Sequence, residues 1–511
     1  MVHVQKFKLG EPTPNSPHAV ISNVPTLEDV CSYEEQKPHT ISAIRQGYPR
    51  FVRHYLVKDC TQAVLDQLDL KVSYAVLVSY TDPELKDLIE ELMGEPELIH
   101  FILLDSKVFG ENLELIYLDK NISSSVLSAF KLFFQHTGYE ISSRHAEKIL
   151  NYMNLNESAG KNENKEKLST VKISVEQFIS QLANSNTKGS FITVSSGMNA
   201  FFSAFKALQD IQFRKGRTKW IQLGWLYVDS GQILKKYLKK EENLSVLYDS
   251  LDVDTILREI KSAGNRLSVL VLECPTNPFC KIADLKIISD AVHAEGGLII
   301  IDPSIVSIYN IDCLPFADIV VSSLTKYTGH NGDLMAGLIA LNFYSKAYLE
   351  LKDRVKIYNA PLHLNDMLHL KNSLRGAKSS IDMMNRNCKA LSKYLKQHPK
   401  VKAVYTTWDS INSEVYLKNP DACGAILSIE IDGSMETFYD YLETVKGPSF
   451  GVNFTVVCPY FYLAHYDLVK DDTPLSLLKN LGINRDLIRI SVGCEEEKVL
   501  INTFAKALEA V

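Results

Sequence analysis

The chain has 511 residues, 46% of them hydrophobic and 23% charged, a composition typical of a globular protein that excludes a disordered or fibrous one. The formal net charge of −6 gives no overall attraction to nucleic acid or to an anionic membrane surface. The nine cysteines include no C-x-x-C pair, so neither zinc nor a disulfide framework is indicated, and we expect a cytoplasmic protein that binds small molecules and no metal.

The first 130 residues predict an N-terminal extension followed by a small α/β unit. Residues 1–45 are rich in Pro, Ser and Thr with little periodicity, as expected of a segment that lies over a surface or a partner subunit. Between residues 51 and 117, apolar stretches such as YAVLVSY alternate with charged helical ones. The beginning of the chain lacks a signal-peptide pattern, and no uncharged apolar run approaches about 18 residues, so no membrane segment is predicted.

Residues 131–342 predict a large domain with a mostly parallel sheet flanked by helices. The apolar runs LSVLVLEC, GLIIID, ADIVVSS and MAGLIAL alternate with helical or turn segments, as expected of strands covered on both faces. Residues 154–167 have almost no large apolar side chains and are predicted to be a flexible insertion. Residues 343–511 predict a smaller C-terminal α/β domain. In such folds, ligands bind at the carboxyl ends of the strands.

Lys326 and Asp302 both follow predicted strands. Lys326 comes after ADIVVSSLT and precedes a Gly-rich turn, although an ordinary solvated lysine is an equally good interpretation of this position alone. Asp302 ends GLIIID, where an acid is costly unless it is paired; a protonated pyridine nitrogen would suit it, and a turn cap is the alternative. The spacing leaves room for one crossover and one strand, so both can reach one crevice.

The segment FITVSSGMNAFFSAFKAL predicts a strand, a tight turn and a helix. The backbone amides of Gly197 and Met198, with the hydroxyl of Ser196, would form a phosphate cradle at the helix start, and a simple helix cap is the alternative. Ser323 and Thr325, beside the lysine, could add hydroxyls to the same phosphate.

Three more side chains have both a functional and a structural interpretation. Tyr227 follows a strand-like stretch and could lie flat on a cofactor ring or pack in the core. Asn277 lies between two prolines, where its amide could bond a ring hydroxyl or stabilise the turn. Arg489 lies on an apolar strand, where it needs a carboxylate from an α-amino-acid substrate or from a structural acid.

The motifs SSGM, YVDS, ECPTNP, SSLTK and IRISVGCE, in this order, resemble the Cys/Met-metabolism family of pyridoxal-phosphate (PLP) enzymes. The segments LGEPTPNSPHAV, GYPRFV, FFQHTGYEISSR and GPSFGVNFTVVCPYFYLAHY are similar to the fungal branch of its cystathionine γ-synthases. The resemblance covers essentially the whole chain and implies fold type I.

The resemblance also implies roles for particular residues. Lys326 would carry PLP as a Schiff base, Asp302 would hold the pyridinium, and Tyr227 would stack on the ring and take part in catalysis. Asn277 would contact the ring oxygen, while Arg489 and Ser449 would bind the substrate α-carboxylate. The remaining predicted cofactor-binding residues are Ser196, Gly197, Met198, Ser304, Ser323 and Thr325.

The family resemblance implies a homodimer or homotetramer with shared active sites, in which a Tyr-x-Arg element of the neighbouring subunit meets the phosphate. Ser142-Ser143-Arg144 keeps only the arginine, and we expect Arg144 to bind the phosphate. Tyr48-Pro49-Arg50 has the right letters but lies far from SSGM in the sequence. The missing tyrosine leaves open which residue activates the amine. Asp302-Pro303-Ser304 also departs from the family pattern and could shift the backbone beside the ring.

The expected reaction is γ-replacement, in which an O-acylhomoserine, expected to be the acetyl ester, and cysteine give cystathionine. An O-acylhomoserine sulfhydrylase or a cystathionine γ- or β-lyase is the alternative, because the same residues serve all these reactions and no arginine follows YVDS to hold a distal carboxylate. A catalytically degenerate regulatory paralogue is a further alternative, weakened by the joint presence of Lys326, Asp302 and Arg489.

Overall fold

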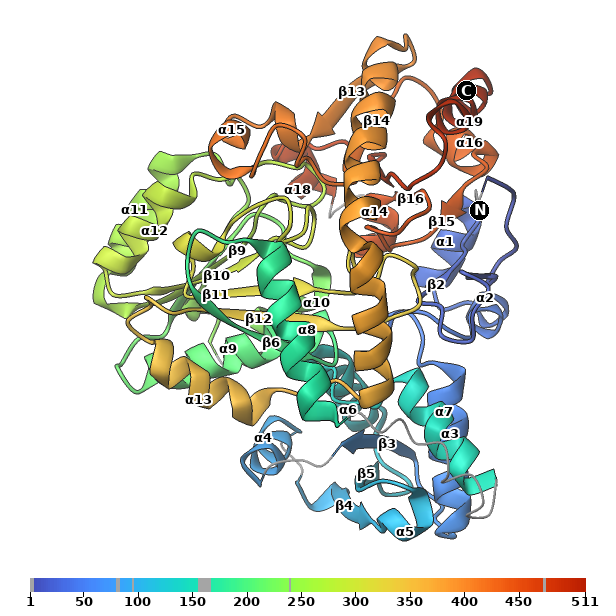
Figure 1. The fold of residues 1–511 in the computed structure, drawn as a ribbon, viewed down its shortest axis with the longest axis vertical. Helices are drawn as coiled ribbons and strands as arrows, with labels where there is room; N and C mark the ends of the chain where they lie inside the picture. Colours follow the sequence, from blue (N-terminus) through green and yellow to red (C-terminus); the bar gives the residue numbers. More distant parts are fainter. Residues whose placement is uncertain (1–3, 80–82, 94–95, 155–166, 239, 472–474) are drawn as a thin grey trace.

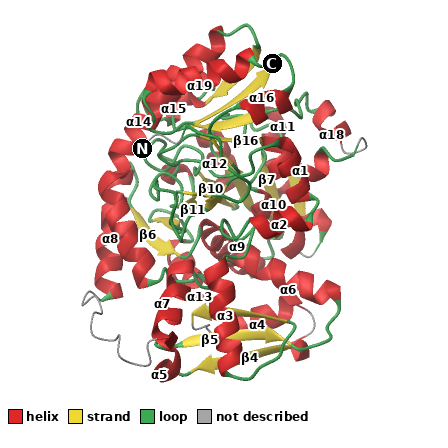
Figure 2. Cartoon of the chain, turned by 90° about the vertical axis from the view of Figure 1, so that its right-hand side faces the viewer, coloured by secondary structure: helices red, strands yellow, loops and turns green. Residues whose placement is uncertain are grey.

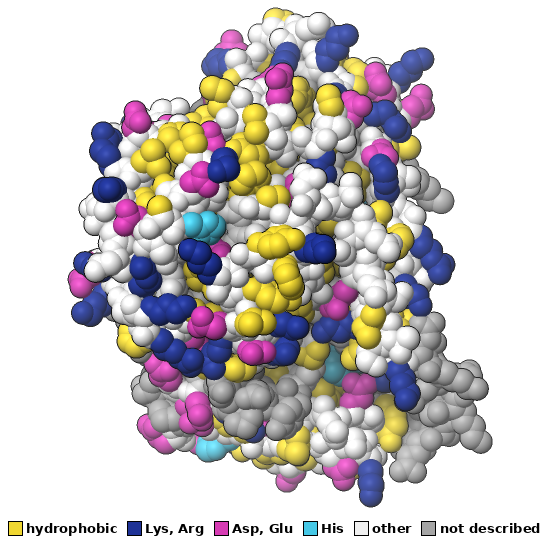
Figure 3. Space-filling model, turned by 60° about the vertical axis from the view of Figure 1, so that its left-hand side comes forward, with side chains coloured by type: hydrophobic (Ala, Val, Ile, Leu, Met, Phe, Trp, Pro, Cys, Tyr) yellow, Lys and Arg dark blue, Asp and Glu magenta, His cyan; other side chains and the backbone are white. Residues whose placement is uncertain are grey.

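The computed structural model describes residues 4–511 except 80–82, 94–95, 155–166, 239 and 472–474, so nearly all of the predicted insertion at 154–167 lies outside the described residues. Three larger sheets succeed one another along the long axis of the molecule (Figures 1 and 2). No described helix is both long and apolar enough to cross a bilayer. Basic and acidic side chains are interspersed on the face seen in Figure 3.

The middle sheet has seven strands in the order β6-β12-β11-β10-β9-β7-β8. Strands β8, β7, β9, β10 and β11 pair in parallel, and β12 runs antiparallel to β11 and β6. The predicted mostly parallel sheet is therefore confirmed. The strands are β6 (Gly189–Val194), β7 (Lys219–Leu223), β8 (Leu244–Leu247), β9 (Leu267–Glu273), β10 (Leu298–Asp302), β11 (Ile319–Ser323) and β12 (Gly337–Asn342).

Successive residues of β9 face opposite sides of this sheet, which explains its uninterrupted apolar sequence. Leu270 and Leu272 belong to a cluster shared with α8, α11 and α12, whereas Val269 and Val271 belong to a cluster shared with α9, α10 and α13. The helices are α8 (Leu168–Ala183), α9 (Gly197–Phe213), α10 (Val228–Tyr237), α11 (Val253–Ala263), α12 (Leu285–Ala294) and α13 (Tyr348–Tyr358).

The C-terminal sheet has five strands in the order β13-β14-β17-β16-β15. The long helix α14 (Leu364–Gln397) leads from the middle sheet to it (Figure 1). Its strands are β13 (Val401–Thr406), β14 (Ile426–Ile431), β15 (Val445–Lys446), β16 (Val456–Pro459) and β17 (Ile488–Ser491). The other helices of this part are α15 (Ser413–Tyr416), α16 (Met435–Tyr441), α17 (Tyr460–Ala464), α18 (Leu475–Asn480) and α19 (Glu497–Glu509).

The small sheet is antiparallel and has the order β3-β5-β4. Alternate residues of its strands point to two apolar clusters, one with α3 and α7 and one with α4, α6 and α9. The small sheet thus shares its core with the middle sheet. Its elements are α3 (Tyr55–Gln67), β3 (Tyr74–Ser79), α4 (Pro83–Met93), β4 (Ile99–Leu104), α5 (Ser106–Phe109), β5 (Leu113–Leu118), α6 (Ser124–Thr137) and α7 (Ser143–Asn154).

The N-terminal segment lies against the C-terminal sheet before it enters α3. Val20 and Ile21 pack in one apolar cluster with residues of β15 and β16, and the Tyr439 hydroxyl donates to the Val24 carbonyl at 2.7 Å. The segment contains β1 (Pro12–Thr13), β2 (Ile21–Ser22), α1 (Leu27–Glu34) and α2 (Pro38–Ala43). Residues 44–54 therefore connect the C-terminal sheet to the small sheet.

Candidate active site

Most of the predicted site residues line one cavity of about 140 Å³ at the carboxyl ends of β9, β10 and β11. A larger cavity, of about 490 Å³, adjoins it and shares some of its wall. The residues that could carry covalent chemistry line the smaller one, which we call the Lys326 cavity. The predicted residues that line it are Ser196, Gly197, Met198, Tyr227, Asn277, Asp302, Ser304, Ser323, Thr325, Lys326 and Arg489.

The Lys326 side chain is only 8% exposed. It lies in the turn after β11, with Nζ 3.2 Å from Ser449 Oγ and hydrogen-bonded to the Tyr48 hydroxyl. Burial, and then the nearby positive charge of Arg489, lower the pKa of this amine well below its ordinary value. A neutral amine is a nucleophile, so this lysine is poised for covalent chemistry rather than for solvation.

Two carboxyl groups lie side by side at the strand ends. Asp302 ends β10 and Glu273 ends β9, and the two residues are direct partners in the parallel register. Burial raises the pKa of Asp302 to about 6, against the hydrogen bonds from Ser304, whose backbone amide donates to Oδ1 at 2.8 Å. Burial and the charge of Asp302 raise the pKa of Glu273 further, so Glu273 is the carboxyl that keeps its proton.

The turn before α9 presents backbone amides and a hydroxyl to the cavity. Ser196 is the N-cap, and its Oγ accepts from the Asn199 amide at 3.1 Å, so the cap interpretation holds for this hydroxyl. The amides of Gly197 and Met198 belong to the first turn, which has no intrahelical acceptors. A Cβ on Gly197 would lie 2.9 Å from Ser323 Cβ, so the end of β11 crowds this helix start.

Gly337 on β12 is required by the close approach of that strand to the α9 turn. A Cβ at this position would lie 2.0 Å from the Ser196 carbonyl oxygen. We expect Gly337→Ala to displace the turn, lower stability by about 1–3 kcal/mol, and weaken cofactor affinity in an absorbance titration. Gly231→Ala is the control, because a Cβ there meets nothing nearer than 3.9 Å. Equal affinities of both variants would contradict the expectation.

The hydroxyls of Thr325 and Ser304 form hydrogen bonds with the backbone around Lys326. Thr325 Oγ1 accepts from the Ala336 amide at 3.1 Å and donates to the Ala336 carbonyl at 3.4 Å, which ties the Lys326 turn to the start of β12. Ser304 Oγ accepts from the Ser323 amide at 2.9 Å. The Pro303-Ser304 departure thus leaves Asp302 capped by a backbone amide within the same turn.

Tyr227 lies at the start of α10, with its backbone amide bonded to the Glu273 carboxyl. The Arg50 guanidinium lies beside its hydroxyl and 3.9 Å from Asp229 Oδ1. Burial raises the pKa of Tyr227 well above its ordinary value, so the hydroxyl stays protonated.

Arg489 comes from β17 of the C-terminal sheet and is 5% exposed. Its guanidinium donates to Asn277 Oδ1 at 3.4 Å and to the carbonyls of Pro448 at 2.5 Å and Ser449 at 3.3 Å. Within the described part of the chain, it forms no ion pair with a carboxylate. The structural-acid interpretation of this arginine is therefore unsupported, and a buried guanidinium remains available for a ligand's carboxylate.

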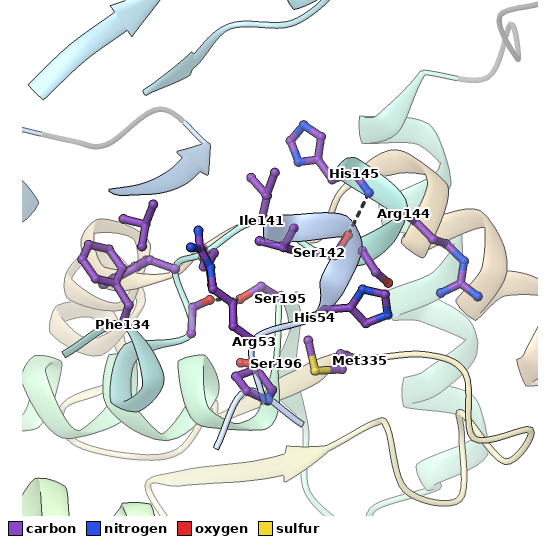
Figure 4. Close-up of a pocket in the computed structure, with 18 of the residues that line it drawn as sticks. Arg53, His54, Phe134, Ile141, Ser142, Arg144, His145, Ser195, Ser196 and Met335 are labelled. Carbon is purple, nitrogen blue, oxygen red and sulfur yellow. Dashed lines mark hydrogen bonds and ion pairs between the residues drawn. The ribbon is translucent and has the colours of Figure 1, made fainter. Parts of the chain in front are cut away.

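Arg144 lies outside the Lys326 cavity of its own chain. It lines the larger cavity, where its guanidinium is 3.4 Å from both Asp333 and Asp366, and Figure 4 shows it on a different side of that cavity from Ser196. Its predicted phosphate contact involves a neighbouring subunit, so one chain does not test it.

Sequence reasoning did not assign Tyr48, Arg50 and Glu273, which also line the Lys326 cavity. Glu273 lies within ECPTNP, directly after the apolar run of β9. An acid at the end of a buried strand indicates a site residue in the same way as Asp302 does. Tyr48 and Arg50 carry the Tyr-x-Arg letters, but their distance in sequence from SSGM argued against them. Only the path of the N-terminal segment brings them to Lys326.

Comparison with known sequences identifies one family over most of the chain. The profile of the Cys/Met metabolism PLP-dependent enzymes matches residues 133–509. An L-2-amino-4-chloropent-4-enoate dechlorinase/desaturase of Streptantibioticus cattleyicolor is 27% identical over 98% of this chain and 97% of its own. A cystathionine γ-synthase of Neurospora crassa is 35% identical over 61% of this chain, and the match spans about half (51%) of that enzyme.

Among solved structures, the cystathionine γ-lyase of Lactobacillus plantarum, in complex with L-serine, matches 69% of this chain and 91% of its own with a TM-score of 0.56. The two are 20% identical in sequence, so this likeness concerns the fold. The predicted fold type I is confirmed.

Proposed function

Since this chain belongs to the Cys/Met metabolism family of PLP-dependent enzymes, we propose that it catalyses γ-replacement, forming cystathionine from O-acetylhomoserine and cysteine. The observation that carries this proposal is that two buried groups line one cavity: the amine of Lys326, and Arg489, which has no acid partner among the described residues. An α-amino acid has a carboxylate for the arginine, and its Cα proton would lie within reach of the amine.

The donor set of the Lys326 cavity fits the family's cofactor. The neutral amine of Lys326 suits a Schiff base, Asp302 suits the ring nitrogen, and the first turn of α9 suits the phosphate. Asn277 would meet the ring oxygen and Tyr227 the ring face. When bound, PLP draws electrons from the substrate carbons, which makes the Cα proton acidic and allows a group at Cγ to leave.

The protein's own part is to orient the amino acid and to move protons. We propose that Arg489, whose guanidinium donates to the Ser449 carbonyl, fixes the substrate carboxylate and so turns the Cα–H bond toward Lys326. The amine then takes the proton from Cα and returns protons to the carbon chain.

Elimination at Cγ without a second substrate is the alternative that a specific observation favours. One relative that matches nearly the whole length of this chain is an enzyme named a dechlorinase/desaturase. Moreover, the cations on the Lys326 cavity are Arg50, Lys326 and Arg489, and Arg50 already faces Asp229. Among the described lining residues, no further cation is left for the second carboxylate that cysteine would bring.

A substrate panel with mass-spectrometric product identification separates these reactions. We expect cystathionine from O-acetylhomoserine and cysteine. The panel includes sulfide as an alternative nucleophile, cystathionine itself, and L-2-amino-4-chloropent-4-enoate. Release of 2-oxobutyrate from cystathionine without any synthesis of cystathionine would overturn the proposal in favour of a lyase, and homocysteine formed only with sulfide would favour a sulfhydrylase.

A further inference from the structure

The Tyr48 hydroxyl lies on the reactive atom of Lys326. It is hydrogen-bonded to Nζ and lies 2.8 Å from Ser449 Oγ, which is itself 3.2 Å from Nζ. The amine also lies 4.0 Å from the Tyr48 ring centre and 4.7 Å from that of Phe450. Two hydroxyls and two rings therefore enclose Nζ. Each hydroxyl can accept a hydrogen bond from Nζ or donate one to it.

The same chain holds Tyr48 in this position through an anchored turn. Gly47 has a φ of +151°, which favours glycine, and the amides of Phe51 and Val52 donate to the Tyr48 carbonyl at 2.8 and 3.0 Å. On the N-terminal side, Gln46 accepts from the Ser22 hydroxyl at 2.6 Å through its carbonyl. The turn is thus fixed at both ends by residues of its own segment.

Burial favours the uncharged forms of both Tyr48 and Lys326. Burial raises the pKa of Tyr48 well above its ordinary value, so it remains a hydroxyl, while burial and the charge of Arg489 lower the pKa of the Lys326 amine and favour its neutral form. A hydroxyl next to a neutral amine can hold the amine lone pair in place, and it can accept from the ammonium once the amine has gained a proton. Ser449 can do the same from the other side.

We propose that Tyr48 is a catalytic residue that acts with Lys326, and that the chain that supplies the lysine also supplies this tyrosine. This inference rests on the proposed function, since it assigns the group that assists proton removal. In the step, the Cα–H bond breaks and an N–H bond forms on Nζ, while the electron pair stays with the substrate, where PLP would stabilise it when bound. The oxygens of Tyr48 and Ser449 accept hydrogen bonds from the new ammonium until it gives the proton back.

Tyr48→Phe tests the role, with Tyr55→Phe as the matched control. Phenylalanine keeps the ring against Lys326 and removes only the hydroxyl. Tyr55 lies in the same segment, but its ring stacks on His54 at 4.8 Å and not on the cavity. The first readout is the rate at which the visible band forms when PLP is added to cofactor-free protein. We expect about tenfold slower formation with an unchanged final absorbance for Tyr48→Phe, and a wild-type rate for Tyr55→Phe.

The second readout is exchange of the Cα proton of L-methionine, which lacks the proposed leaving group, in D₂O by NMR. We expect about a 10²-fold loss in Tyr48→Phe, the lower end of what general acid–base catalysis contributes. If wild-type protein exchanges the proton but makes no cystathionine, the proposed function fails and Tyr48 keeps its role. Wild-type rates of both band formation and exchange in Tyr48→Phe overturn the role whatever the overall reaction is.

Mixing two inactive chains tests which chain supplies the tyrosine. Lys326→Ala and Tyr48→Phe chains with different tags are co-expressed, and mixed assemblies are purified through both tags. If one chain supplies both residues, no complete site forms and the activity stays at or below that of Tyr48→Phe. If a neighbouring chain supplied Tyr48, each mixed pair would regain one complete site, and that recovery would overturn the assignment.

Discussion

Lys326→Ala is expected to abolish the visible absorbance of the purified protein and to lower turnover by at least about 10⁴-fold, a loss in the range seen when a covalent catalytic group is removed. Two functions would be lost together. The cofactor would lose its covalent anchor, and the substrate would lose the amine that takes its Cα proton. Lys326 is held in place by Tyr48, Ser449 and Phe450. No other described lysine lines this cavity, so none is positioned to replace it.

Absorbance, borohydride reduction and peptide mapping check this expectation. Reduction of the wild-type holoenzyme should fix the cofactor covalently on the peptide that contains Lys326, and the variant should give no labelled peptide. Lys346→Ala is the control, because Lys346 is an exposed lysine after β12 and its loss should change neither colour nor rate. A coloured Lys326→Ala protein with a label on another lysine would show that the anchor is misassigned. A colourless wild-type protein would instead support the alternative of a catalytically degenerate regulatory paralogue.

The sequence predicted the middle sheet because its strands are buried on both faces. A run such as LSVLVLE in β9 needs apolar side chains at every position, and such runs are bounded sharply by turns. The polar residues that follow them, Asp302 and Lys326, therefore stood out and could be assigned to one crevice. Arg489 stood out for the same reason, as a charge within an apolar strand.

The contribution of the N-terminal segment could not be predicted in the same way. Tyr48 and Lys326 are 278 positions apart, and Tyr48 has no apolar periodicity around it to reveal an element. Its place depends on how residues 18–24 pack against the C-terminal sheet, which is tertiary information. The prediction for Arg144 followed spacing along the chain instead, and the structure places this residue in the adjoining cavity of its own chain.

Asp302→Asn is the second change with a large expected effect. The carboxylate is proposed to pair with the protonated ring nitrogen of the cofactor, and an amide of the same shape cannot supply the charge. A charge-assisted hydrogen bond is worth about 1.5–3 kcal/mol, so we expect turnover to fall by about 10-fold to 100-fold. The protein should remain coloured, because Lys326 is unchanged. Asp290→Asn, on the exposed side of α12, is the control and should behave as wild type.

The cofactor-free form of the same variant carries a prediction of opposite sign. Burial raises the pKa of Asp302 from 3.8 to about 6, so between these values the folded state holds a proton that the unfolded state has lost. Wild-type stability should therefore fall as the pH rises through this window, and the full cost of the buried charge is present above it. Asparagine carries no charge, while burial, the first cause of the raised pKa of Glu273, is present in both proteins. Cofactor-free Asp302→Asn should thus melt above wild type at pH 8 and together with it near pH 4; a wild-type protein that melts higher at pH 8 would mean that the carboxylate is already compensated by the protein alone.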